Sequence, residues 1–270
     1  ETAAQSPALA WLGVLDAPIA GRLAATLDPS GRLTGTDAKL EIGAGALHPN
    51  ESTRPIVFER AGLNFSLNTD AGMLTFSDLS VESKTLRLSA SGKTRVPGLS
   101  EGRPTAFISQ VKINDLRVDP AGLFEEPVIF SEGAIDARLT LNPFRIDLGQ
   151  VALREGDRRL VAKGSALAGA DGWNLSLDVA LNEIRHDRLL ALWPVGLVTK
   201  TRTWLMNNVQ QGVLSNVRGG VRLRPGQEPE LLLNYDFTGA DVRFMQTLPP
   251  VRDAYGYSTI RGTTYTTVLD

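Results

Sequence analysis

The sequence predicts an all-β protein whose strands form one elongated, curved antiparallel sheet with a short helical insertion. Three observations support this fold class. Apolar and polar residues alternate along most of the chain, short polar turns separate the alternating segments, and helical spacing of apolar residues is confined to one stretch.

The alternation assigns an apolar face to each predicted strand, because successive side chains of a strand point to opposite sides of a sheet. The segments LNFSLN (63–68), AIDARLTL (134–141) and NLSLDVAL (174–181) show this pattern most clearly. We expect the apolar members to form one continuous inner surface. The residues expected to line it are Leu63, Phe65, Leu67, Leu86, Leu88, Ile135, Leu139, Leu141, Leu175, Leu177, Val179, Leu231 and Leu233.

The segments between strands are short and rich in Asp, Asn, Pro and Gly, as in DPSG (28–31), NTDAG (68–72) and AGADG (168–172). Such loops join antiparallel neighbours, whereas parallel strands need long crossovers that are usually helical. The loose repetition of turn and strand has no fixed period. We therefore expect a sheet that grows hairpin by hairpin as one continuous unit, with groove strands over 1–185 and 213–270 and the helical insertion over 186–212.

The helical insertion has two parts. Leu189, Leu190 and Trp193 lie at helical spacing, and Pro194 ends this first segment. A second helix is expected to begin with Thr199 or Thr201 as its cap and to end near residue 211, with Gly212 as a left-handed terminator. The residues expected to dock the insertion on the sheet are Trp193, Trp204, Leu205 and Val209. The insertion either covers part of the apolar face or gates an apolar channel.

Composition excludes several functions. The 270 residues carry a net charge of −2 without a run of basic residues, which argues against a nucleic-acid partner. The chain has no cysteine, so it has neither disulfides nor thiolate ligands. No apolar stretch approaches the roughly 18 to 20 residues that span a bilayer. Since the sequence starts without Met, we interpret it as a segment of a longer protein.

Catalytic and metal-binding patterns are also missing. His48 and His186 are far apart and outside any metal-ligand motif. Glu125 and Glu126 could be considered as an acid/base pair, but neighbouring residues of a strand face opposite ways. We expect no catalytic residue, no metal site and no cofactor, and hence a protein that is not an enzyme.

Two segments resemble the AsmA-like/YhdP-type family of bacterial envelope proteins. They are LWPVGLVTKTRTWLMNNVQQGVLSNVRGGVRL (192–223) and FTGADVRFMQTLPPVRDAYGYSTIRG (237–262), and the segment 15–47 is similar to a recurring part of that family. The matching positions are Trp193, Pro194, Arg202, Trp204, Gly212, Leu248, Pro249, Val251, Asp253, Ala254 and Gly256.

The resemblance implies a repeating β-groove that carries phospholipid between the inner and outer membranes of a Gram-negative bacterium. It also implies a periplasmic location, with membrane contact made by parts of the parent protein outside this chain. Two alternatives remain open at this point. The chain could be a structural or assembly scaffold of the envelope without lipid cargo, or it could bind envelope proteins by adding strands at exposed sheet edges.

Overall fold

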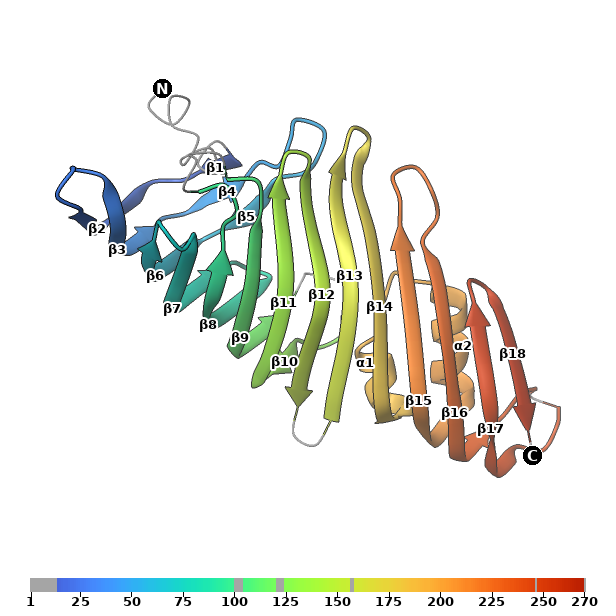
Figure 1. Ribbon diagram of the computed structural model, residues 1–270. Helices are drawn as coiled ribbons and strands as arrows, with labels where there is room; N and C mark the ends of the chain where they lie inside the picture. The colour runs from blue at the N-terminus through green and yellow to red at the C-terminus, as the bar shows by residue number, and fades with distance from the viewer. Residues whose placement is uncertain (1–13, 100–103, 120–123, 156–157, 246, 270) are drawn as a thin grey trace.

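The computed structural model describes residues 14–99, 104–119, 124–155, 158–245 and 247–269. Within them the chain forms a 15-stranded antiparallel sheet, a separate three-stranded sheet and two short helices (Figure 1). The predicted all-β fold class with a short helical insertion is confirmed. The elements are β1 (Leu15–Asp16), β2 (Ile19–Leu27), β3 (Leu33–Ile42), β4 (Gly45–Leu47), β5 (Ile56–Phe58), β6 (Arg60–Asn68), β7 (Met73–Glu82), β8 (Leu86–Arg95), β9 (Phe107–Val118), β10 (Val128–Phe130), β11 (Glu132–Leu141), β12 (Phe144–Glu155), β13 (Arg158–Gly169), β14 (Gly172–Arg185), α1 (His186–Ala191), α2 (Thr199–Asn208), β15 (Val209–Leu223), β16 (Glu230–Val242), β17 (Val251–Arg261) and β18 (Thr264–Leu269).

The large sheet is a meander in which most strands pair with their neighbours in sequence. Its order runs from β2 through β3, β6, β7, β8, β9 and β11 to β18, and β10 pairs with β9 next to β11. The hairpin of β4 and β5 leaves this path between β3 and β6 and pairs with β1 in the small sheet. Figure 1 shows the strands as a continuous series from the blue edge at β2 to the red edge at β18.

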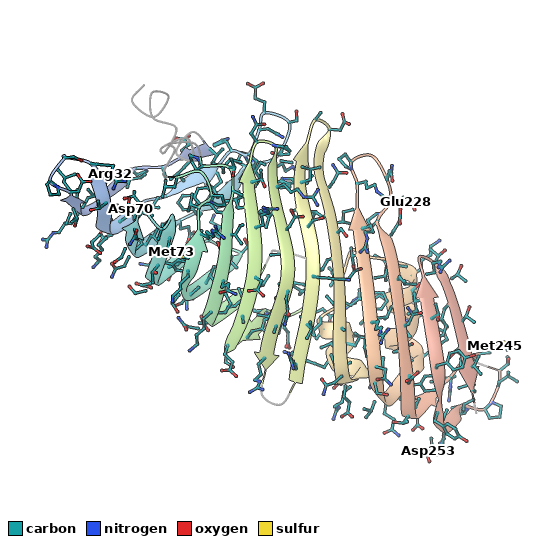
Figure 2. The ribbon with its side chains drawn as sticks, in the orientation of Figure 1. Arg32, Asp70, Met73, Glu228, Met245 and Asp253 are labelled. Carbon is teal, nitrogen blue, oxygen red and sulfur yellow. The ribbon has the colours of Figure 1, made fainter. Side chains whose placement is uncertain are left out.

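Local turn chemistry explains why the hairpins form where the polar segments lie. In the β2–β3 turn the Asp28 carboxylate accepts hydrogen bonds from the backbone N–H groups of Ser30 and Arg32, and Gly31 has a φ of +80°. Arg32 also pairs with Asp70 of the β6–β7 turn, with 2.7 Å between Nη1 and Oδ1. Figure 2 shows these two side chains near each other at the edge of the sheet.

The strand register places the predicted lining residues on one face of the large sheet. Directly opposed residues of neighbouring strands share a face. Leu177 lies opposite Gly164 and Val221, and Leu233 lies opposite Gly219 and Ile260. Bulges adjust the register between strands, so that Ile135 pairs with Val151 while Ala137 pairs with Leu148. Followed from β2 to β18, this register puts every predicted lining residue on the same side.

The β4–β5 hairpin, which we call the strap, shows that this apolar face is concave. At the tip of the strap, Asn50 donates hydrogen bonds to the carbonyl groups of Ala168 and Gly169 at the β13–β14 turn, at 3.0 and 3.3 Å. Seven strand spacings separate β3 from β13, which is about 34 Å along the sheet. The eight residues 43–50 reach at most about 29 Å, and the Asn50 side chain with its hydrogen bond adds roughly 6 Å. Bends at Ala44 and Pro49 shorten this reach, so the strap connects the two places because the sheet bends toward it.

Close backbone approach on the concave face also explains some glycines. A Cβ atom at Gly164 would lie 2.3 Å from the carbonyl oxygen of Ser176 on β14. At Gly92 it would lie 2.2 Å from the carbonyl oxygen of Gln110 on β9. Any larger residue at either position would therefore push two paired strands apart, which a bent sheet cannot accommodate without loss of hydrogen bonds.

The helical insertion differs from its prediction at both ends of the second helix. Val198, in a left-handed conformation, occupies the cap position of α2, and no side chain caps the helix. Thr199 and Thr201 instead lie inside it. The helix ends at Asn208, so Val209 and Gly212 belong to β15, which pairs with β14 and β16. The gain of sheet pairing by residues 209–212 explains why the helix stops before the glycine. Neither described helix has the length and apolar character required to cross a bilayer.

Candidate functional site

The concave face is mainly apolar, with a few hydroxyl side chains such as those of Thr94 and Ser109, and its exposure to solvent changes from one region to the next. Leu231 and Leu233 of β16 are buried, at 9% and 5% exposure. Leu175 and Leu177 of β14 are 37% and 40% exposed. The remaining predicted lining residues are half-buried: Leu63, Phe65, Leu67, Leu86, Leu88, Ile135, Leu139, Leu141 and Val179. Solvent therefore reaches part of a surface that the alternation makes apolar.

The helical insertion covers the C-terminal part of the concave face. In Figure 1 both helices lie behind strands β14–β17. Trp193 and Leu205 are buried in one cluster with Ile184, Val217 and Ile260, and Trp204 and Val209 pack against that cluster. Trp193 also donates a hydrogen bond from its indole nitrogen to the Leu197 carbonyl at 2.7 Å, which satisfies its polar group inside the core. Here the insertion replaces solvent with a dry interface.

A second apolar cluster lies on the middle part of the concave face. Val128 and Phe130 of β10 are buried with Ile113, Val151 and Leu153, and Phe124 packs against them. An ion pair joins this region to the helical insertion. The guanidinium of Arg202 on α2 lies 2.7 Å from the Glu125 carboxylate and donates a second bond to the Leu190 carbonyl at 3.2 Å.

The strap crosses the concave face near one rim. Its tip is held by the Asn50 bonds and by Trp173 of β14, whose indole nitrogen lies 3.5 Å from the Arg54 carbonyl oxygen. Trp173 in turn meets Phe144 edge to face, with 6.0 Å between ring centroids. The strap and the insertion thus bound the open part of the concave face from two sides.

An apolar pocket lies between α2 and the last strands. The cavity itself has a volume of about 40 Å³, and the unfilled space grows to about 550 Å³ when its open mouth is included. Leu189 and Leu205 of the helices and Phe237 of β16 form part of its wall. Tyr235 and Tyr265 also line it, with 3.4 Å between their hydroxyl oxygens. Burial raises the pKa of Tyr235 above its ordinary value of 10.0, so this hydroxyl stays protonated.

The opposite face of the sheet is polar. Asp37 and Lys39 of β3 and Arg138 of β11 are exposed there, and Arg222 pairs with Asp178 at 2.6 Å. The sheet therefore has one wettable face and one apolar face, as the alternation predicts. Exposed exceptions on the polar side include Leu232, Tyr255 and Tyr257, at 38%, 57% and 53% exposure.

The residues weighed as catalytic groups do not come together. His48 lies 4.0 Å from Asp16 at the small sheet, whereas His186 begins α1 and lines the pocket. Glu125 is engaged by Arg202. The described residues include no group of three or more His, Cys, Asp or Glu side chains that could hold a metal ion.

Sequence reasoning did not find the strap or the pair of tyrosines in the pocket. Tyr235 lies in a predicted strand, but its partner Tyr265 is 30 residues away on β18. Asn50 contacts residues that are 118 and 119 positions away. These contacts join residues that are distant in sequence, and the sequence has no short-range signal for them.

No family model, curated protein or solved structure matches this chain.

Proposed function

We propose that this chain is a segment of a lipid-transfer conduit whose concave face shields phospholipid acyl chains from water. The observation that carries the proposal is the continuous apolar face with solvent-exposed members at Leu175 and Leu177. Large exposed apolar surfaces mark places where a protein meets another apolar partner. Each methylene transferred from water to such a surface contributes about 0.8 kcal/mol, so acyl chains bind without any specific residue.

The shape and polarity of the sheet support a linear cargo. The apolar face runs across many strands, while the polar face and turns stay in water. A lipid with its tails on the concave face can keep its head group at the open rim. In this proposal the segment works in the periplasm, and other parts of an inner-membrane-anchored parent protein make the membrane contacts. The resemblance of residues 192–223 to AsmA-like proteins supports this location and a role in outer-membrane homeostasis.

The alternative is a structural scaffold of the envelope without cargo. It is favoured by the helix-covered part of the concave face, where Leu231 and Leu233 are as buried as a protein core. A scaffold would use the whole face in this way, with the exposed leucines covered by protein partners. The two functions therefore differ in what contacts Leu175 and Leu177.

Site-specific photo-crosslinking in living cells distinguishes them. A photoreactive amino acid is placed at Leu177 of the full-length protein, and at Leu232 as the matched control. Both side chains are similarly exposed, at 40% and 38%, but they lie on opposite faces of the sheet. We expect a phospholipid adduct at Leu177 and none at Leu232, detected by mass spectrometry. A protein adduct at Leu177 without lipid, or equal lipid labelling at both positions, contradicts the conduit.

A further inference from the structure

The pocket beneath α2 lies beside a cluster of four hydroxyl groups, which is larger than the Thr94–Ser109 pair elsewhere on the concave face. Tyr235, Ser258, Tyr265 and Thr267 bring their hydroxyls together on the concave side of β16, β17 and β18. Ser258 is only 1% exposed and bonds Thr267 closely. Three of these residues, Tyr235, Tyr265 and Thr267, line a pocket whose other walls are mostly apolar. Pockets of this kind orient ligands through a few placed polar groups.

The Tyr265 hydroxyl is the member of the cluster with capacity for a ligand. Its two contacts, to Tyr235 at 3.4 Å and to Ser258 at 3.3 Å, are longer than the usual O–H···O range of about 2.5 to 3.0 Å. A ligand oxygen at normal distance would therefore form a better bond than either present contact. The ring is held in place by Trp204 of α2, with 5.4 Å between the ring centroids.

The charge of the pocket limits the chemical class of the ligand. The described lining residues include no Asp, Glu, Lys or Arg, and their histidine, His186, lies at the start of α1 next to Asp187. An anionic carboxylate or phosphate inside would therefore lose its hydration and gain no permanent positive charge from the described walls. A neutral oxygen, by contrast, needs only one hydroxyl donor. The pocket thus fits an aliphatic chain that carries an uncharged acceptor near its end.

We infer that this pocket binds one ester-linked acyl chain of a lipid, with the ester carbonyl accepting a hydrogen bond from the Tyr265 hydroxyl. The chain lies against Leu189, Leu205 and Phe237, and the head group stays at the pocket mouth. The inference rests on the proposed conduit and makes the helix-covered end of the concave face a defined holding site. Tyr265 is a specificity residue that distinguishes ester lipids from ether lipids.

The test compares two soluble ligands that differ only at the carbonyl. Binding of 1-decanoylglycerol and of its ether analogue 1-O-decylglycerol is measured by isothermal titration calorimetry with the full chain. We expect the ester to bind about two- to tenfold more tightly than the ether, because one neutral hydrogen bond has an effect of this size. Tyr265→Phe should remove this preference while leaving the ether affinity unchanged. Tyr257→Phe, on the opposite face of β17 and 53% exposed, should keep the preference.

A pocket-filling variant provides a second readout. Ala240 is 4% exposed and lines the pocket, so Ala240→Leu should abolish binding of both ligands. Equal affinities for ester and ether in the unaltered chain, or an ester preference that survives Tyr265→Phe, would overturn the inference. Absence of any binding would do the same. These outcomes are separate from the conduit test: a lipid adduct at Leu177 without an ester preference rejects the holding site alone, and an ester preference without that adduct rejects the conduit.

Discussion

At the scale of single residues, the environment of a leucine on the concave face decides what a charge at that position does. Leu177 and Leu233 share one face, but they are 40% and 5% exposed. An aspartate at position 177 can keep its hydration, whereas an aspartate at position 233 would be buried without a partner. The alternation predicts that both leucines lie on one face of the sheet, but it does not predict that their exposure differs.

We therefore predict that Leu177→Asp changes the free energy of unfolding by less than about 1 kcal/mol, whereas Leu233→Asp lowers it by about 3 kcal/mol or more. Urea denaturation of both variants measures this, with unchanged slopes as the control for two-state behaviour. With the photoreactive amino acid moved to Leu175 on the same face, the Leu177→Asp substitution should block lipid adducts in the groove. A loss of several kcal/mol at Leu177 would show that this region is a closed core.

A second residue-scale prediction concerns the β2–β3 turn. Hydrogen bonds from the Ser30 side chain and the Arg32 backbone lower the pKa of Asp28 from its ordinary value of 3.8 to about 2. Because the folded pKa lies below the unfolded one, the contribution to stability is fully present above about pH 4 and is lost as the pH falls toward 2. An NMR titration of the Asp28 carboxyl should have its midpoint near 2, and Ser30→Ala should raise it. A midpoint near 3.8 in the unaltered chain contradicts this.

At the scale of elements, α2 is held to the middle of the sheet by an ion pair between unequal partners. The Arg202 side chain is 7% exposed and that of Glu125 is 47% exposed. Removing the carboxylate leaves a buried guanidinium with the Leu190 carbonyl as a remaining acceptor. Such a loss is costly in a core, but the exposed side of the pair is screened by water.

We predict that Glu125→Gln destabilises the protein by about 1 to 2 kcal/mol, between the effects typical of exposed and of buried pairs. The matched comparison is Asp178→Asn, which breaks the pair with Arg222, whose side chains are 40% and 34% exposed. It should cost less than about 1 kcal/mol. Thermal or urea unfolding of both variants gives the comparison. Equal effects would mean that burial of Arg202 adds nothing to this contact.

The elements also show where sequence reasoning reached its limit. Trp193 and Trp204 were expected to lie against the sheet, and both lie in or against the cluster beneath the helices. The end of the second helix was misplaced because Gly212 is a good helix terminator in isolation. Pairing of Val209 and Gln211 with β16 takes these residues into a strand instead. Tertiary pairing overrode the local signal, which a single sequence cannot report.

At the scale of the whole molecule, alternation predicts a meander with one apolar face, and the register from β2 to β18 has this property. The amount of bending could not be predicted. It depends on bulges, such as the one between Asp136 and Ala137, and on close contacts at Gly92 and Gly164. The strap follows from the same bending, since its tip reaches β13 only across a curved sheet.

The open edges of this sheet lead to a last prediction. Among the described residues, β2 pairs only with β3, and β2 is exposed along its full length, including Leu23 at 67% and Leu27 at 59%. An unpaired edge strand with exposed apolar residues can pair with a strand of another chain, and a lysine that points inward prevents such pairing. We expect the purified chain to associate with itself as its concentration rises, and Leu23→Lys to reduce this association. Sedimentation velocity measures both, with Ala24→Lys on the polar face of β2 as the control that adds the same charge. If the chain remains a monomer at all concentrations, or if both lysines act alike, the apolar edge of β2 is not what drives pairing.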